Sequence, residues 1–173
     1  MHNHLALIKT MRPNQKVSEG ETLHVSDMDI ILSQALLMDA GSLTFKAIKS
    51  GGIADILAGL VSLAYTALQT LAIQDKDIVE NQGEGYQQYQ MLAIMRLLSD
   101  KIHLCSSGQV GHYSDVYHLC ANLATGFLNA DFNKAFQIYH EWSEACQGCG
   151  IETNKSHDPH QIKPPDLTDC LFE

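Results

Sequence analysis

The sequence is poor in basic residues. Of its 173 residues only 11 are lysine or arginine, against 20 aspartates and glutamates, so the formal net charge is −9 and the isoelectric point is about 5.3. A protein that binds DNA or RNA needs a basic surface to meet the phosphates, so this balance argues against a nucleic-acid partner. A small phosphorylated ligand stays possible, because a magnesium ion can supply the positive charge.

Signals for β-strands, internal repeats and low-complexity segments are also missing. Apolar residues recur instead at helical spacing, as Ile31, Ala35 and Met38 do. Hydrophobic residues make up 45% of the chain and charged residues 18%, which is the composition of a folded domain. We therefore expect one all-α domain over residues 1–173, a multi-helix bundle of about five helices.

Local signals place the helix boundaries. Ser26 or Asp27 is a good N-cap, and Ser50-Gly51-Gly52 is a clear stop. Residues 1–25 form an irregular or partly helical N-terminal arm, residues 26–146 the bundle, and residues 147–173 an extended tail around Pro164-Pro165. The predicted helices cover residues 28–49, 53–73, 86–104, 113–128 and 132–146.

Residues 56–73 contain no charged side chain and are long enough to span a bilayer. Polar residues interrupt the run, no second such segment exists and no basic cluster flanks it, so we expect no membrane span. A helix that is apolar nearly all round is otherwise buried in a bundle. In so small a domain, full burial usually needs a partner subunit. The sequence thus predicts a four-helix-bundle core completed by dimerisation, in a homodimer.

Features of a secreted protein are absent. The first residues have no basic region followed by a long apolar run, and five cysteines is an odd count that fits a reducing compartment. We therefore expect a cytoplasmic protein. Cys146 and Cys149 form a Cys-x-x-Cys motif with histidines nearby, which leaves a zinc site open as an alternative to two free thiols.

The central helix carries a polar stripe. Ser62, Thr66 and Gln69 follow Asp55 at offsets of seven, eleven and fourteen residues, which lie near one line along a helix. The neighbouring sequence holds no glycine-rich phosphate loop and no serine nucleophile elbow. A carboxylate at Asp55 is also favoured by the helix dipole without any function.

Residues 59–65, Gly-Leu-Val-Ser-Leu-Ala-Tyr, match the pattern Gly-Leu-x-Asp-Leu-x-Tyr except at its acidic position. With the preceding residues 45–51, this segment resembles the all-α nucleoside triphosphate pyrophosphohydrolases, the MazG-like superfamily. The resemblance is good over residues 35–70, and residues 136–140 and 163–167 look like weaker C-terminal patterns of the family.

The acidic motifs of this family are only partly present. Its Glu-Glu-x-x-Glu pattern falls on Met38, Asp39 and Ser42, and its Glu-x-x-Asp pattern falls on Asp55 and Ala58. The acidic position of the later pattern falls on Ser62. Two carboxylates therefore remain, each shorter than the glutamate that the family has.

The resemblance implies a Mg²⁺-dependent hydrolase that splits a nucleoside triphosphate between its α and β phosphates. Asp39 and Asp55 would be the catalytic residues and would hold Mg²⁺, and the partner subunit would complete the pocket. The nucleotide would be bound by Ser42, Ser62, Lys46, His140 and Lys163.

Two alternatives stay open. The chain can be a catalytically degenerate relative that acts as a ligand-binding or protein-interaction module. It can also be a purely structural protein, in which the polar stripe sets the register of the helices. The hydrolase predicts a metal site, and the degenerate relative predicts a pocket without a metal. The structural protein predicts that side chains fill the space along the polar stripe and leave no pocket.

Overall fold

The computed structural model describes residues 2–10, 25–80, 90–148 and 163–172. Apart from one isolated bridge between Ala130 and Leu171, the regular structure of these residues is helical, which confirms the all-α prediction. In chain order the helices are α1 (His2–Thr10), α2 (Asp27–Ser50), α3 (Ile53–Ile73), α4 (Met91–Leu104), α5 (Val110–Gly126) and α6 (Phe132–Gly148), with short 3-10 turns η1 (Cys105–Ser107) and η3 (Thr168–Cys170).

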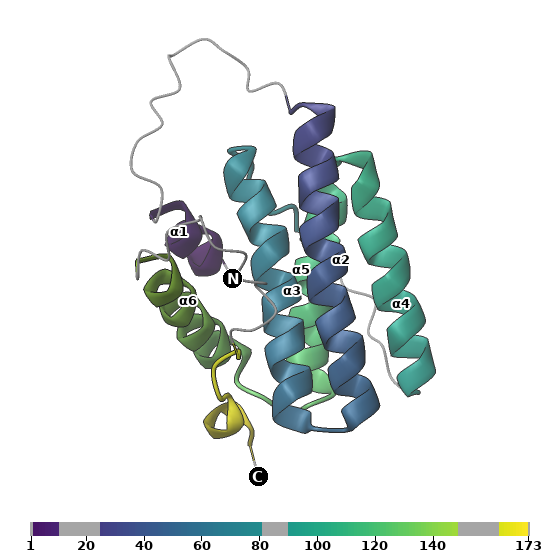
Figure 1. The fold of residues 1–173 in the computed structure, drawn as a ribbon, viewed down its shortest axis with the longest axis vertical. Coiled ribbons are helices and arrows are strands. Elements are labelled where there is room, and N and C mark those ends of the chain that lie inside the picture. The colour runs from purple at the N-terminus through teal and green to yellow at the C-terminus, as the bar shows by residue number, and fades with distance from the viewer. Residues whose placement is uncertain (1, 11–24, 81–89, 149–162, 173) are drawn as a thin grey trace, which may run out of the picture.

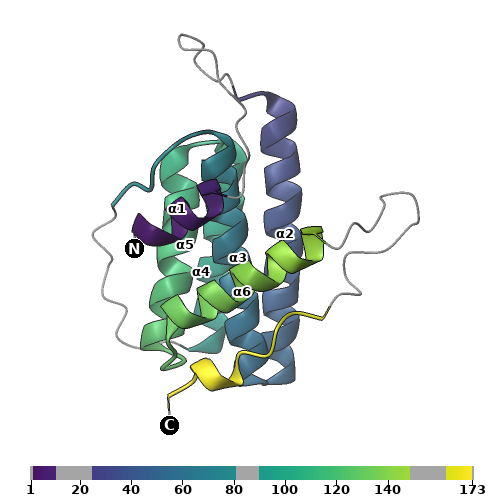
Figure 2. The ribbon, with the colours of Figure 1, turned by 90° about the vertical axis from the view of Figure 1, so that its left-hand side faces the viewer.

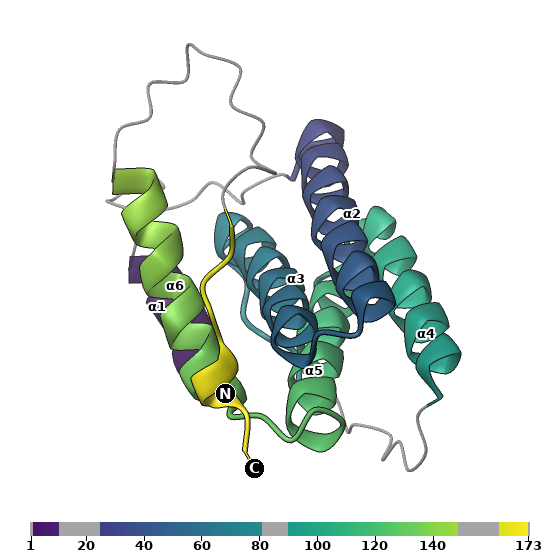
Figure 3. The ribbon, with the colours of Figure 1, turned by 60° about the horizontal axis from the view of Figure 1, so that its bottom comes forward.

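Four helices form the core and two cover one side of it. α2, α3, α4 and α5 stand side by side, with α2 against both α3 and α4 and α5 against both α3 and α4 (Figure 1). α6 and α1 pack against α3 on the side away from α4 (Figures 2 and 3). The four-helix core is thus assembled from one chain.

Helix α2 begins and ends where its capping residues predict. The backbone N–H of Asp29 donates to Ser26 Oγ at 3.2 Å, and the N–H of Ser26 donates to Asp29 Oδ2 at 3.0 Å, which completes a capping box. At the other end Gly51 takes a left-handed φ of 80° and its N–H donates to the carbonyl of Ala47 at 3.0 Å. These local signals define the α2–α3 hairpin.

Helix α3 is the centre of the molecule. Its neighbours α1, α2, α5 and α6 surround it, and only Ile53, Asp55 and Ile73 are exposed. It is the one helix of the described residues that is long and apolar enough to cross a membrane, and 78% of its apolar window is buried inside the bundle. A core position therefore explains its composition. Its burial needs no second subunit, so the expected dimer requires a different argument.

The remaining boundaries differ from the predictions by a few residues. α4 begins at Met91 after an extended Gln90, while residues 86–89 lie outside the described part of the chain. α5 begins at Val110 rather than 113, because Gln109 lacks a capping side chain that would mark the start in the sequence. The predicted arm contains α1, with Leu5 and Ile8 buried against the core.

The C-terminal segment is not a free tail. The N–H of Asp131 donates to the carbonyl of Cys170 at 2.8 Å, and the N–H of Phe172 donates to the carbonyl of Asn129 at 3.0 Å. Leu167 and Cys170 are buried. Residues 163–172 therefore return to the turn between α5 and α6 and cover the base of that helix pair (Figure 2).

Candidate functional site

The two predicted catalytic carboxylates lie far apart along the α2–α3 hairpin. Gly59 sits against Thr44, since a Cβ added at Gly59 would lie 2.8 Å from the Thr44 Cα. Asp39 comes five residues before Thr44, so it lies opposite Ala64, nine residues along α3 from Asp55. At a rise of 1.5 Å per residue the two carboxylates are separated by about 13 Å along the helix axes.

This separation decides what the pair can bind. Magnesium accepts oxygen ligands at about 2.0–2.1 Å, so a single ion cannot reach both carboxylates. Asp39 is exposed on α2, and the Asp55 carboxylate folds back over Gly52 in the first turn of α3, where an added Cβ would lie 2.6 Å from its Oδ2. The structure does not bring the predicted metal ligands together.

Within the described residues, no group of three or more histidine, cysteine, aspartate or glutamate side chains could hold a metal ion. Cys146 is a free, half-buried thiol at the end of α6. Its motif partner Cys149 and the histidines after it lie outside the described residues, so the zinc alternative stays a prediction.

Ser62 lies where α6 packs against α3, and side chains of the protein fill this contact. Beyond the first turn of α3, the half-buried residues are Ser62, Thr66 and Gln69, so the predicted polar stripe does mark one side of the helix. The hydroxyl of Tyr139 on α6 donates to Ser62 Oγ at 3.0 Å, and the Thr66 hydroxyl donates to the Ser62 carbonyl at 2.9 Å. Burial raises the pKa of Tyr139, so this hydroxyl keeps its proton.

His140 and Lys163 also lie on the α6 side. His140 is buried, with Nδ1 3.2 Å from the Tyr65 hydroxyl and Nε2 3.7 Å from the carboxylate of Glu144. Lys163 is exposed at the start of the C-terminal segment. Neither residue shares a site with Lys46 on α2, which lies across α3 from α6 (Figure 3).

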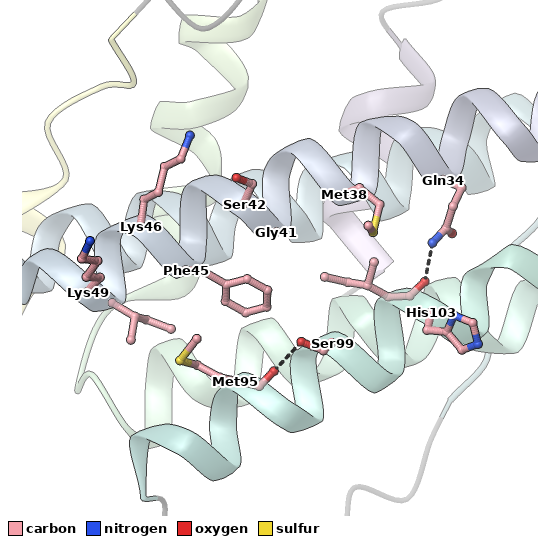
Figure 4. A pocket seen from close by; sticks show the side chains of 12 residues that line it. Gln34, Met38, Gly41, Ser42, Phe45, Lys46, Lys49, Met95, Ser99 and His103 are labelled. Atoms are coloured by element: carbon pink, nitrogen blue, oxygen red, sulfur yellow. Dashed lines mark hydrogen bonds between the residues drawn. The ribbon is translucent and has the colours of Figure 1, made fainter.

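A groove of about 920 Å³ opens between α2 and α4, and two of the predicted binding residues, Ser42 and Lys46, line it (Figure 4). Most of its wall is apolar. The full lining is Gln34, Met38, Gly41, Ser42, Phe45, Lys46, Ile48, Lys49, Met95, Ser99, Ile102 and His103.

The packing of Ile102 explains why the groove exists. A Cβ on Gly41 would lie 2.8 Å from Ile102 Cδ1, and Gln34 Nε2 donates to the Ile102 carbonyl at 3.1 Å. These contacts hold α4 close to α2 at this level. Farther along, Phe45 projects toward α4 and Met95 toward α2, and the space between the helices is not filled (Figure 4).

The few polar groups of the groove are distributed unevenly. Ser99 donates to the carbonyl of Met95 at 2.8 Å and is satisfied within its own helix. Gln34 Oε1 is buried without a hydrogen-bond partner among the described residues. Lys46, Lys49 and His103 stand along the edges, and no aspartate or glutamate lines the groove. The result is an apolar slot with two lysines at its border, whose side chains extend from α2 on the side away from α4 (Figure 4).

Comparison with protein families, with curated proteins and with solved structures finds no match for this chain. The site therefore has to be judged from its own chemistry. Sequence reasoning found Ser42 and Lys46 but missed Phe45, Met95 and Ile102, because their roles depend on α4 packing beside α2. The apolar positions of residues 86–104 predicted a helix, but they do not show which other helix it packs against.

Proposed function

We propose that this protein is a non-catalytic binding module, and that the groove between α2 and α4 binds an organic anion with an apolar or aromatic body. The observation that carries this proposal is the pair of lysines, Lys46 and Lys49, at the border of an apolar groove that no carboxylate of the described residues lines. In a chain of net charge −9, a site of this kind is favourable for an anion.

The groove suits a small molecule in size and composition. Ligand sites in proteins have volumes of roughly 300–1,000 Å³ and combine apolar walls with a few polar groups. An apolar or aromatic body would lie between Phe45 and Met95, with its charged group at Lys46 and Lys49. Gln34 Oε1, which has no partner of its own, would accept a hydrogen bond from the ligand.

Two kinds of ligand share this chemistry. A nucleotide would stack its base on Phe45 and place its phosphates at the lysines, in keeping with the family resemblance. An acyl carboxylate would use the same apolar wall and the same cations. We place this binding in the cytoplasm, where the free thiols of the described residues would stay reduced.

Nucleotide hydrolysis has weaker support. Magnesium-dependent attack at phosphorus needs carboxylates that converge on the metal, and Asp39 and Asp55 lie on different levels of the hairpin. A bound nucleotide would therefore be held without being cleaved.

Calorimetric titration of the full chain tests the proposal. The probes are ATP alone, ATP with Mg²⁺, and dodecanoate, which separate a nucleotide ligand from an acyl ligand. We expect one of the two anions to bind without added metal. Replacing Phe45 by alanine, or Lys46 and Lys49 together by alanine, should weaken that binding at least about tenfold, equivalent to about 1.4 kcal/mol.

Lys163→Ala is the matched control, because it removes an exposed lysine from the other side of α3. It should bind the ligand as the unmodified chain does. Equal binding by the Lys46 and Lys49 variant would contradict the assignment of the groove. Pyrophosphate release that requires Mg²⁺ and is abolished by Asp39→Asn would overturn the non-catalytic proposal in favour of the hydrolase.

A further inference from the structure

The outward side of α2 is largely apolar and, within the described part of the chain, exposed over four turns. Six large side chains are exposed there, with exposed fractions from 42% to 69%. Single exposed apolar residues are common on protein surfaces, but a contiguous set marks an interaction site. We call this set the outer face of α2, and it consists of Met28, Ile31, Leu32, Leu36, Met38 and Leu43, with Ala35 at its centre.

Helix α2 is thus apolar on two opposite sides. Leu37, Ala40 and Thr44 are buried against the core, while the outer face points away from it. Between Ile30 and Leu43 the only charged residue is Asp39, which is exposed within the outer face, one turn from Ala35 and one turn from Leu43. An exposed apolar set of this size on a helix marks a surface that a partner can cover. In Figures 1 and 2 the N-terminal end of α2 stands clear of α3, so another helix can reach it.

We propose that a second copy of this chain covers the outer face, with the two α2 helices packed antiparallel about a two-fold axis near Ala35 and Leu36. The charges at the two ends of the helix favour this occupant. Exposed Asp27 and Asp29 lie in the first turn of α2, and Lys46 and Lys49 lie near its last turn. An antiparallel partner places the acidic end of each helix beside the basic end of the other.

The lysines near the end of α2 are available for such pairs. Within the described part of the chain, the ion pairs found do not involve Lys46 or Lys49. Antiparallel helix dipoles attract, and an isologous contact uses the same face of both copies. Near the axis the small Ala35 leaves room for the two backbones to approach, while Leu32 and Leu36 pack on either side of it.

The second copy would also complete the groove. Met38 belongs both to the outer face and to the groove lining, and Ser42 lies one turn farther along the same edge. A helix packed on the outer face therefore runs along the open side of the groove and narrows its mouth. This consequence rests on the proposed ligand site, whereas the dimer itself depends only on the outer face.

The experiment is analytical ultracentrifugation of the full chain without ligand. A dimer of twice the 19.1 kDa chain mass is expected. Leu32→Glu with Leu36→Glu brings like charges together near the axis and should raise the dimer dissociation constant at least about 100-fold, with helicity unchanged in circular dichroism. The matched control is Leu92→Glu with Leu104→Glu, which alters two exposed leucines of α4 and should leave the dimer intact.

A charge exchange tests the orientation. Lys46→Glu should weaken the dimer, Asp27→Lys should weaken it as well, and the two changes in one chain should restore it. Rescue by the double variant supports the antiparallel arrangement, and its absence overturns it. A monomer at all concentrations, or a dimer that survives Leu32→Glu with Leu36→Glu, overturns the whole proposal. Since no ligand is present, these results are independent of the calorimetric test of the groove.

Discussion

The two sides of the α2–α3 hairpin differ in how completely side chains fill them. On the α6 side, aromatic rings fill the space: the ring of His4 stacks on Phe136 with centroids 4.1 Å apart, and Tyr65, Tyr117 and Phe132 pack around them. On the α4 side, a groove stays open between Phe45 and Met95. The chain thus fills one side of its core with its own aromatic rings and leaves an apolar groove on the other side.

On the α6 side the Tyr117 hydroxyl lies 2.9 Å from His4 Nδ1, and the Tyr139 hydroxyl donates to Ser62. Among the described residues two buried polar atoms have no hydrogen-bond partner, Gln34 Oε1 in the groove and the Tyr113 hydroxyl on α5. Buried polar atoms are normally paired, so Gln34 Oε1 is an open hydrogen-bond acceptor in the groove. The predictions below test whether stability is concentrated on the closed side.

The largest difference is expected between two phenylalanines. Phe136 is fully buried in the aromatic cluster, whereas Phe45 is half-buried in the groove. Phe136→Ala should lower the free energy of unfolding by about 3–5 kcal/mol, because it leaves a cavity in a packed core. Phe45→Ala should lower it by less than about 1 kcal/mol. Urea denaturation measures both, and equal losses would show that the two sides do not differ.

The pH dependence of stability should report on the closed side. Burial lowers the pKa of His4 from 6.5 to about 4, so the unfolded chain binds more protons than the folded one between these values. The contribution of neutral His4 is complete above pH 6.5 and is lost as the pH falls toward 4. It should amount to something on the order of 3 kcal/mol.

The control for this prediction is His4→Gln, which keeps a polar side chain and cannot titrate in this range. The free energy of unfolding of the variant, measured by urea denaturation from pH 7 to pH 4, should fall less steeply than that of the unmodified chain. Parallel curves would show that His4 is not seated among the rings in solution.

Two glycines of the hairpin allow a smaller and well matched test. Gly59→Ala would press against the Thr44 backbone, which cannot turn aside, so it should cost about 1–3 kcal/mol. Gly41→Ala meets only the end of the Ile102 side chain, which can rotate into the groove. The gain in helix propensity of up to about 1 kcal/mol should then leave its stability nearly unchanged. Thermal denaturation of both variants decides whether the α2–α4 side is the adaptable one.

The smallest effect on stability is expected at the hydrogen bond between Tyr139 of α6 and Ser62 of α3. Tyr139→Phe removes the hydrogen bond to Ser62 and keeps the ring, so it should lower the free energy of unfolding by about 1 kcal/mol. The double change Tyr139→Phe with Ser62→Ala should cost little more, because both partners of the bond are then gone. A loss that is simply additive would mean that the two groups do not interact.

Elements with strong local signals were predicted from the sequence. The N-cap signal at Ser26 or Asp27 and the glycines at residues 51 and 52 predicted the ends of α2 to within a residue, and α3 was predicted with its observed bounds. The all-α class and the buried position of α3 were confirmed. Each of these depends on residues close together in the chain.

The site could be predicted only in part, since it depends on distant packing. Ser42 and Lys46 were identified through the family resemblance, but the α2–α4 contact that makes a groove beside them joins segments about 55 residues apart. Asp39 and Asp55 were paired by matching motif positions. The distance between them followed only once Gly59 was found opposite Thr44. Motif spacing carries no information on helix register, which is set by where side chains are small enough to allow contact.

The seat of α1 has a consequence for the order of folding. His4 contacts Tyr117 and Phe136, which lie more than 110 residues later in the chain. Contacts between such distant residues form late, after local hairpins, because closing a long loop costs entropy. The ring contacts of His4 are therefore completed only after α5 and α6 have packed against the core. A chain that lacks α6 would keep the contact of α1 with α3 and lose the Phe132 and Phe136 rings that pack on His4.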